Sequence, residues 1–360
     1  MKILIVGAGP IGCYLAHLLT QKNKNFDITV IEEHACSGQP VHCSGLVSQS
    51  LFSKARFKLP QDAIVNSIDG AQIHLDGDSF QIKKKAVAFV LERRMFDYLL
   101  SQNINVVYDS RFLGIEKGKN QYIVLTEKGD FSADIVIGAD GANSNVRKVI
   151  DSEENVKYYT GAQARVKTEN FKRHLVGVYL KRPFFAWAIP ESDDIVRVGL
   201  IAKNPYSQLL KLLKELKIEG QVLEKFGGIL PLGTCLTAKD NIALVGDAAC
   251  QVKPLTHGGL YFGMRCAEIL CDCIVNNRLN LYEKRWRSKF GSEIEFGLKI
   301  KRLYEELDDE NLSKVFKLLK NNRGILERFA DFDGHSDIIL RLVKMDGAQK
   351  ILGRLLLKLI

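Results

Sequence analysis

The first twelve residues are MKILIVGAGPIG, and they contain the strongest indication of the fold. Four consecutive apolar residues, Ile3 to Val6, predict a short strand that is buried on both faces, as in a parallel sheet. Gly7, Gly9 and Gly12 follow with the spacing G-x-G-x-x-G. An apolar pattern of helical period then extends from Ile11 to about Lys22. A strand, a glycine-rich turn and a helix in this order are typical of a dinucleotide-binding unit.

Each of the three glycines has a separate physical role in such a unit. Gly7 makes the tight turn out of the strand, Gly9 lets a pyrophosphate reach the backbone, and Gly12 lets the helix pack closely on the sheet. The helix N-terminus adds unpaired N–H groups and a partial positive charge, both of which favour a phosphate. The spacing therefore predicts a nucleotide site at the end of the first strand.

A carboxylate stands where such a site would use one. The apolar segment Ile28 to Ile31 predicts a second strand, and it ends in Glu32, 20 residues after Gly12. A carboxylate at this place can accept hydrogen bonds from ribose hydroxyls. Glu33 is the competing candidate, and an ordinary βαβ unit with two solvated glutamates is the alternative without a ligand.

Composition narrows the class of protein. The chain has 360 residues, of which 46% are hydrophobic and 26% are charged, as expected for a soluble globular protein of two or three domains. No run of 18 apolar residues occurs, so we expect no transmembrane helix. The first strand begins at the first residues and leaves no room for a signal peptide, which favours a cytoplasmic location.

Charge and cysteine spacing exclude two further classes. The net charge is +9, but the basic residues form small clusters without interleaved aromatic residues, which argues against nucleic-acid binding. A weak attraction to anionic membranes or acidic ligands fits this charge better. The eight cysteines form no paired C-x-x-C set, so we expect no metal site and free thiols in a reducing compartment.

Local patterns predict the elements between residues 36 and 100. Residues 36–54 lack periodicity and predict a shaped loop, because they contain two glycines and a proline. Residues 64–90 predict short strands separated by turns at Asp69-Gly70 and Asp76-Gly77. Glu92 to Leu100 predicts an amphipathic helix.

Strands and helices alternate in the remainder of the chain. Strands are expected near residues 105–108, 112–117, 122–126, 135–137 and 242–245, a β-rich block at 160–201, and helices at 205–217, at 259–275 and after Tyr282. The strand at 135–137 leads into Asp140-Gly141, and the strand at 242–245 leads into Gly246-Asp247. Three buried strands therefore end in glycine-containing turns.

In this order the three turns resemble the three FAD fingerprints of the para-hydroxybenzoate-hydroxylase-type flavoproteins, over roughly residues 1–290. The segment Arg93-Arg94-Met95-Phe96-Asp97 also fits the R-x-x-F-D segment of that group, and the resemblance places Arg93 near the FAD phosphates. A carboxylate such as Asp247 at a strand end could bond the ribityl hydroxyls. The turn from Pro254 to Gly258 and Gly259 precedes a helix whose positive end could face the flavin N1–C2=O edge.

Two other segments resemble the geranylgeranyl reductase family. Residues 40–48, PVHCSGLVS, look like its Pro-Val-x-Cys-x-Gly motif, and residues 184–190, FFAWAIP, resemble its aromatic-x-Trp-x-x-Pro segment. Its archaeal members, which saturate the isoprenoid chains of membrane lipids, are the nearest likeness. The departures from the family are His257 for the first glycine of a triplet, Phe185 for a common tyrosine, Ile189 for a common phenylalanine and Cys250 for a usual glycine.

The resemblance implies an α/β fold: a Rossmann-like FAD-binding domain with an inserted β-rich substrate domain and a C-terminal helical region. We expect the FAD-binding domain to comprise residues 1–68, 91–158 and 235–290. The remaining parts are a β-rich insert at 69–90, the substrate-binding domain at 159–234 and the helical domain at 291–360.

The resemblance also implies hydride transfer from flavin N5 to an isolated carbon–carbon double bond. Such an alkene must be protonated as hydride arrives, so the site needs a proton donor, a dry pocket and an aromatic face for the developing cation, worth about 0.5–2 kcal/mol. Trp187 is the candidate for that face, with a plain core tryptophan as the alternative. Cys43 is the candidate for a catalytic or proton-relay residue, with a small buried filler as the alternative. His257 either relays protons or crowds the flavin.

The expected partners are an isoprenoid lipid substrate and an electron donor. The sequence contains no second dinucleotide fingerprint, so the donor is either NAD(P)H that binds transiently or a small ferredoxin-like protein. Residues 347–360 predict a basic amphipathic helix that either contacts the inner face of the membrane or packs on its own domain. Two other functions stay open: a flavin monooxygenase of the same fold and a non-catalytic prenyl-binding protein.

Overall fold

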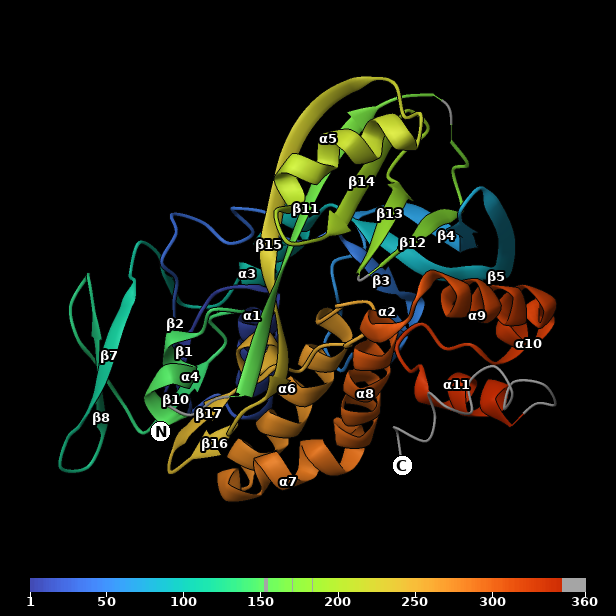
Figure 1. Ribbon diagram of the computed structural model, residues 1–360. Coiled ribbons are helices and arrows are strands. Elements are labelled where there is room, and N and C mark those ends of the chain that lie inside the picture. The colour runs from blue at the N-terminus through green and yellow to red at the C-terminus, as the bar shows by residue number, and fades with distance from the viewer. Residues whose placement is uncertain (152–154, 170, 183, 345–360) are drawn as a thin grey trace.

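The computed structural model describes residues 1–151, 155–169, 171–182 and 184–344 (Figure 1). A six-stranded sheet carries the first strand at its centre, in the order β16-β17-β10-β1-β2-β6. Its strands are β1 (Lys2–Val6), β2 (Asp27–Ile31), β6 (Val106–Val107), β10 (Ile135–Gly138), β16 (Ala238–Lys239) and β17 (Ile242–Leu244). Neighbouring strands are parallel except β16 and β17, so the predicted parallel sheet is confirmed.

Alternate side chains of β1 face two separate layers. Ile3 and Ile5 are packed with α1 (Pro10–Lys22) and α6 (Leu260–Val275) in one core cluster. Leu4 and Val6 belong to a second cluster with α4 (Asn145–Ile150) and a three-stranded sheet. The strands of that sheet are β7 (Phe112–Lys117), β8 (Tyr122–Thr126) and β9 (Phe131–Ala133). The α/β fold with a Rossmann-like unit is therefore confirmed.

The second large sheet has eight strands in the order β15-β11-β14-β13-β12-β4-β5-β3. Its strands are β3 (Leu46–Ser48), β4 (Ile64–Leu75), β5 (Asp78–Leu91), β11 (Asn155–Lys167), β12 (Val176–Lys181), β13 (Phe184–Pro190), β14 (Ile195–Ile201) and β15 (Gln221–Thr234). Strands β4 and β12 pair in parallel, so the segments around 69–90 and 159–234 contribute to one sheet. The edge strand β15, with 14 residues, had no counterpart in the sequence prediction.

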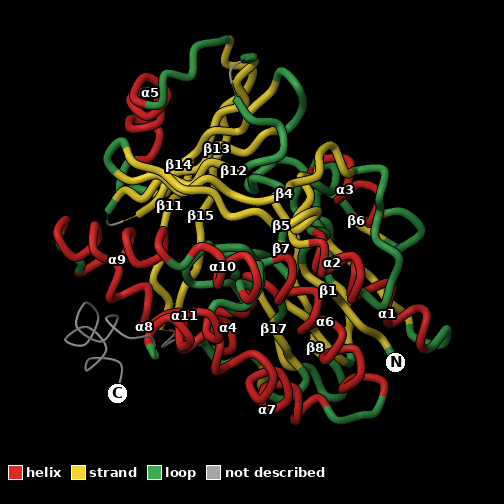
Figure 2. The backbone as a smooth tube through the Cα atoms, turned by 90° about the vertical axis from the view of Figure 1, so that its right-hand side faces the viewer, coloured by secondary structure: helices red, strands yellow, loops and turns green. Residues whose placement is uncertain are grey.

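Helices cover this sheet on one face and at one end (Figures 1 and 2). Helix α5 (Pro205–Glu215) packs on the outer face through Leu209, Leu212 and Leu213. The C-terminal helices pack against the β4–β5 hairpin, and Figure 2 shows them beneath that end of the sheet. The other helices are α2 (Gln49–Lys54), α3 (Arg93–Ser101), α7 (Tyr282–Trp286), α8 (Ser292–Glu306), α9 (Asp309–Asn321), α10 (Arg323–Phe329) and α11 (Ser336–Val343), with short helical turns at Gly246–Ala249, Leu279–Leu281 and Arg287–Gly291.

Two local predictions were wrong. The loop predicted for residues 36–54 ends early, because Ser48 caps a short helix, α2, by accepting a hydrogen bond from the Leu51 N–H (3.1 Å). Asp69-Gly70 is no turn but an irregularity inside the continuous strand β4, where a Cβ on Gly70 would lie 2.0 Å from the Ile82 carbonyl oxygen.

The turn predicted at Asp76-Gly77 is confirmed. Leu75 pairs with Asp78, and both turn residues have positive φ, 46° and 84°. At the other end of the chain, the amphipathic helix predicted for 347–360 lies outside the described residues. Within the described residues, no helix combines the length and the apolar character that a membrane crossing requires.

Candidate active site

The three glycine-containing turns meet at one edge of the six-stranded sheet. Val6 pairs with Gly138 and Gly138 pairs with Leu244, so β1, β10 and β17 are direct neighbours whose carboxyl ends lie side by side. The Val245 N–H donates to the Gly138 carbonyl oxygen at 2.9 Å, and the Ala139 N–H donates to that of Val6 at 2.8 Å. A single ligand can therefore contact all three turns, as the sequence predicted.

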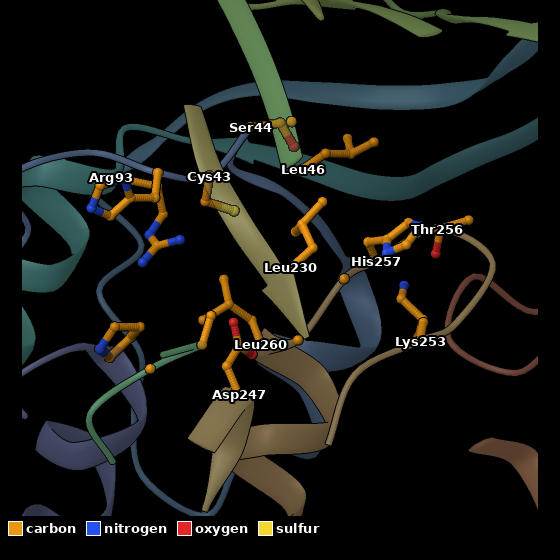
Figure 3. A pocket seen from close by; sticks show the side chains of 18 of the residues that line it. Cys43, Ser44, Leu46, Arg93, Leu230, Asp247, Lys253, Thr256, His257 and Leu260 are labelled. Carbon is orange, nitrogen blue, oxygen red and sulfur yellow. The ribbon is translucent and has the colours of Figure 1, made fainter. Parts of the chain in front are cut away.

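These turns open into one cavity of about 1270 Å³ that continues to the eight-stranded sheet. It is lined by most of the residues predicted from the sequence: Gly7, Gly9, Glu32, Cys43, Arg93, Asp140, Gly141, Trp187, Asp247, His257, Gly258 and Gly259. Gly12, Gly246 and Pro254 do not line it. Figure 3 shows Arg93 and Cys43 on one side of this space, Asp247 and Leu260 below, and His257, Thr256 and Lys253 opposite.

The fingerprint glycines fall into two groups. A Cβ on Gly7 would lie 2.5 Å from the Ala139 carbonyl oxygen, and a Cβ on Gly12 would lie 2.1 Å from that of Gly7. These two residues are glycine because the backbone packs against them. Gly9 and Gly141, by contrast, have no atom within 4 Å of the place of a Cβ, and both line the cavity. Their backbone is open to a ligand.

The carboxylates of Glu32 and Asp140 both accept hydrogen bonds from residues in or next to the turns. Glu32 accepts hydrogen bonds from the N–H groups of Ala8 (2.8 Å) and His34 (3.1 Å), so it is fixed against the glycine-rich loop. Glu33 also lines the cavity but is exposed. Asp140 accepts from the Ser144 hydroxyl (2.6 Å) and from the first N–H groups of α4, so its carboxylate holds the turn while Gly141 presents the open backbone.

Asp247, in the third turn, packs against the start of α6. A Cβ on Gly259 would lie 2.3 Å from Asp247 Oδ1, so the carboxylate rests directly against the residue that precedes α6. Burial raises the pKa of Asp247, although Arg93 and Arg147 act to lower it. The N-terminal end of α6, at Leu260, faces the cavity.

Arg93 supplies a fixed positive charge beside Cys43. Its guanidinium donates to both oxygens of Asp97, at 3.0 and 2.7 Å. Burial acts to lower the pKa of Arg93, but Asp97 and the Cys43 side chain outweigh it, so that pKa is raised and the residue stays charged. The thiol of Cys43 therefore lies beside this cation, on the same side of the cavity (Figure 3).

The far part of the cavity is apolar. Side chains from the inner face of the eight-stranded sheet line it: Val178, Phe185, Trp187, Ile189, Ile201 and Leu230. The Trp187 ring lies directly over Gly199, where a Cβ would be 2.4 Å from the ring atom Cζ2. The Phe185 ring centroid is 5.8 Å from that of Trp187. This surface can grip a hydrocarbon chain and excludes water.

His257 stands between the two parts. Its backbone is left-handed, with φ of 58°, and the residue is 8% exposed. The ring centroid lies 5.4 Å from that of Tyr159, and among the described residues neither ring nitrogen has a hydrogen-bond partner. Burial and the nearby Lys301 lower the pKa of His257 to about 3. The imidazole is therefore neutral at pH 7 and carries no proton to release as imidazolium.

Comparison with known proteins agrees with this arrangement. Residues 2–336 match the family described as "Lycopene cyclase protein". The chain belongs to this family. An uncharacterized protein of Methanocaldococcus jannaschii is 33% identical over 95% of this chain and 94% of its own. A digeranylgeranylglycerophospholipid reductase of Methanothrix thermoacetophila is 27% identical over 89% of this chain and 91% of its own.

The solved structure of a geranylgeranyl bacteriochlorophyll reductase-like protein from Thermoplasma acidophilum has the same fold. It covers 98% of both chains with a TM-score of 0.83 and 21% identity. The resemblance to geranylgeranyl reductases is thus confirmed, and the comparisons support an oxidoreductase.

The structure gives structural roles to two buried arginines for which the sequence had suggested none. Arg147, which is fully buried, donates to the carbonyl oxygens of Ala248 (2.9 Å) and Ala142 (2.8 Å) and so ties two of the turns together. A buried arginine gives no periodic signal, since arginine is usually exposed. Its position in the short helix that directly follows the Asp140-Gly141 turn is the sequence signal that could have pointed to it.

Arg197 clamps the loop that carries Cys43. It is 4% exposed and donates to the carbonyl oxygens of Ser44 (2.6 Å) and Leu91 (2.9 Å). Gly45 has φ of 76°, and a Cβ there would lie 2.5 Å from Arg197 Nη1. The glycine of the Cys-x-Gly motif is required chiefly by this left-handed backbone and by the Leu91 carbonyl oxygen, which would lie 2.4 Å from a Cβ.

Proposed function

We propose that the protein is an FAD-dependent reductase that saturates carbon–carbon double bonds in isoprenoid chains, with the chains of membrane lipids as the substrate class. The observation that carries this proposal is the single cavity, whose one end is formed by three nucleotide-type turns and whose other end is apolar. Its volume of about 1270 Å³ exceeds what one small ligand requires, roughly 300–1,000 Å³. A nucleotide and a hydrocarbon chain can share it.

The residues at the turns suit FAD. The open backbone at Gly9 and Gly141 leaves room for phosphate oxygens, and a Cβ at either place would project into open space. Glu32 would accept hydrogen bonds from ribose hydroxyls and Asp247 from those of the ribityl chain, and both residues line the cavity. Arg93 adds a fixed cation for phosphate, and the end of α6 at Leu260 adds unpaired N–H groups.

The chain's own residues supply what the reaction needs besides reducing equivalents. When bound, FAD would supply the hydride. Cys43 is the proposed proton donor, because Arg93 beside it can stabilise the thiolate that remains after the proton has left. Trp187 offers an aromatic face to the positive charge that develops on the alkene carbon. His257, neutral and unpaired, is proposed to shape the cavity rather than to give a proton.

The test is the mass of the lipid after incubation. Purified protein is reduced with dithionite without oxygen and mixed with a geranylgeranyl lipid, which bypasses the choice between NAD(P)H and a ferredoxin-like donor. We expect hydrogen to be added in pairs. A requirement for oxygen, together with one added oxygen atom, would contradict the reductase and favour the monooxygenase.

The family match favours one second candidate, an acid-initiated cyclisation of a polyene. Cyclisation and reduction share the first event, because each adds a proton to an isolated double bond in a dry pocket. They differ in what meets the cation, which is hydride in one case and a second double bond in the other. The same experiment separates them: reduction raises the mass of the lipid, whereas cyclisation leaves it unchanged.

A further inference from the structure

The cavity reaches the surface beside β15. Two side chains line the cavity and are also large, apolar and exposed: Tyr206, 53% exposed, and Ile229, 45% exposed; no others of this kind occur in the described part of the chain. Tyr206 lies in the first turn of α5, and a Cβ on Gly227 would lie 2.8 Å from its hydroxyl oxygen. Ile229 is two residues further along β15. Apolar side chains therefore frame this mouth of the cavity.

The exposed face of α5 continues the same surface. Leu210 lies one helical turn after Tyr206 and is 51% exposed, although α5 already buries Leu209, Leu212 and Leu213 on the sheet. The helix thus has a second apolar strip that faces away from the protein. In Figure 1, α5 lies at the top of the molecule, on the outer side of the eight-stranded sheet.

Basic side chains surround this strip. Residues 203–225 contain five lysines, all exposed, against three glutamates. Two of the glutamates are engaged within the protein, since Glu215 pairs with Lys181 and Glu224 pairs with Arg94 and Arg165. The surface around α5 therefore carries an excess of free positive charge. Exposed apolar residues within a basic rim are the pattern that binds an anionic lipid surface.

We propose that α5 and the adjoining edge of β15 dock on an anionic lipid bilayer, and that the substrate chain passes from the bilayer into the cavity between Tyr206 and Ile229. The passage of the substrate chain rests on the proposed function, whereas the docking on the bilayer does not. A tyrosine with an apolar ring and a polar hydroxyl suits the boundary between lipid and water. Lysines at the rim lie where their ammonium groups meet lipid phosphates.

The test is sedimentation of the full-length protein with phosphatidylcholine vesicles, with and without phosphatidylglycerol. Leu210→Glu is the test variant, because Leu210 does not line the cavity. Leu113→Glu on β7 is the matched control, since Leu113 is similarly exposed, at 56%, and lies outside the cavity. We expect Leu210→Glu to weaken binding to anionic vesicles about tenfold, as loss of one inserted leucine implies. The control binds as the wild type does, and high salt weakens binding for both.

Activity separates this inference from the proposed function. With lipid dispersed in detergent, Leu210→Glu should reduce the substrate at the wild-type rate, and with lipid in vesicles it should be slower. If the wild-type protein reduces no lipid dispersed in detergent, the proposed reductase function is wrong, and the docking surface is not affected by this result. If Leu210→Glu binds vesicles as the wild type does, the proposed docking surface is wrong. This result would follow if residues 345–360 were responsible for all of the vesicle binding. An equal loss in both leucine variants overturns the docking surface as well.

Discussion

The two ends of the cavity are built in different ways. At the strand tips, backbone atoms set the shape. A Cβ on Gly7, which lines the cavity, would lie 2.5 Å from the Ala139 carbonyl oxygen, and a Cβ on Gly12, behind it, would lie 2.1 Å from that of Gly7. At the eight-stranded sheet, side chains such as Trp187 and Ile189 set the shape. Three departures from the geranylgeranyl reductase pattern, at Phe185, Ile189 and His257, line the cavity in or beside the apolar part. Backbone geometry tolerates little change, whereas a side-chain wall can be altered to suit another substrate.

The largest expected effect is at the tips. In Gly12→Ala the new Cβ would lie 2.1 Å from the Gly7 carbonyl oxygen, and backbone cannot move aside as a flexible side chain can. We expect about 3 kcal/mol of destabilisation and loss of bound flavin, read from thermal melting and from the visible absorption of the purified protein. The control is Gly9→Ala, whose Cβ meets no atom within 4 Å; it should fold normally and bind flavin more weakly. If Gly12→Ala keeps the flavin absorption and the melting temperature of the wild type, the backbone at the strand tips does tolerate change and the comparison is wrong.

The second effect concerns the boundary between the two ends. Cys43→Ala should keep the flavin spectrum and lose alkene reduction by about 10²-fold, the usual worth of a general acid. Cys36→Ala is the matched control, because Cys36 also lines the cavity. If Cys43→Ala turns over at the wild-type rate, the thiol has no chemical role.

The third effect is at the apolar end. In Gly199→Ala the Cβ would lie 2.4 Å from the Trp187 ring and displace it. We expect kcat/KM for the lipid to fall about tenfold, or about 1.4 kcal/mol, with unchanged flavin absorption. Gly161→Ala is the control, since its nearest neighbour would be at an ordinary 3.7 Å. An equal loss in both variants would mean that the sheet, and not the tryptophan, was disturbed.

The smallest effect is a dependence of stability on pH. Burial and Lys301 lower the pKa of His257 from 6.5 to about 3, so the folded protein binds this proton less readily than the unfolded chain. The contribution of His257 to stability is therefore complete above pH 6.5 and is lost as the pH falls toward 3. Between pH 7 and 5.5 the wild type should lose about 1 kcal/mol more than His257→Asn, measured by urea unfolding.

Asparagine is chosen because it accepts the left-handed backbone at this position. His335, whose pKa burial lowers to about 4, is present in both proteins and cancels in the difference. Identical pH profiles for the two proteins would show that His257 is not buried in its neutral form.

The sequence predicts the strand-tip end of the cavity better than it predicts the apolar end. Gly7, Gly9, Gly12 and Glu32 were predicted from spacing, and Asp247 from its place at a strand end and from the family resemblance, because a turn between a strand and a helix is a local structure with few solutions. Of these residues, Gly7, Gly9, Glu32 and Asp247 line the cavity. Strand β15 was missed, since its edge position leaves it without a regular apolar pattern. The clamp of Arg197 on Ser44 was missed because its partner is 153 residues away.

Patterns in the amino-acid sequence were enough to predict the buried strands of a parallel sheet, the three turns and the resemblance to geranylgeranyl reductases. Each of these was predicted from a pattern within a short stretch of the chain, such as a run of apolar residues that is followed by a glycine-containing turn. Three further features required the folded chain: the segments at 64–91 and 155–234 form one sheet, Trp187 lies over Gly199, and the polar and apolar ends share one cavity. These features depend on strand pairing across long separations, which no local pattern specifies.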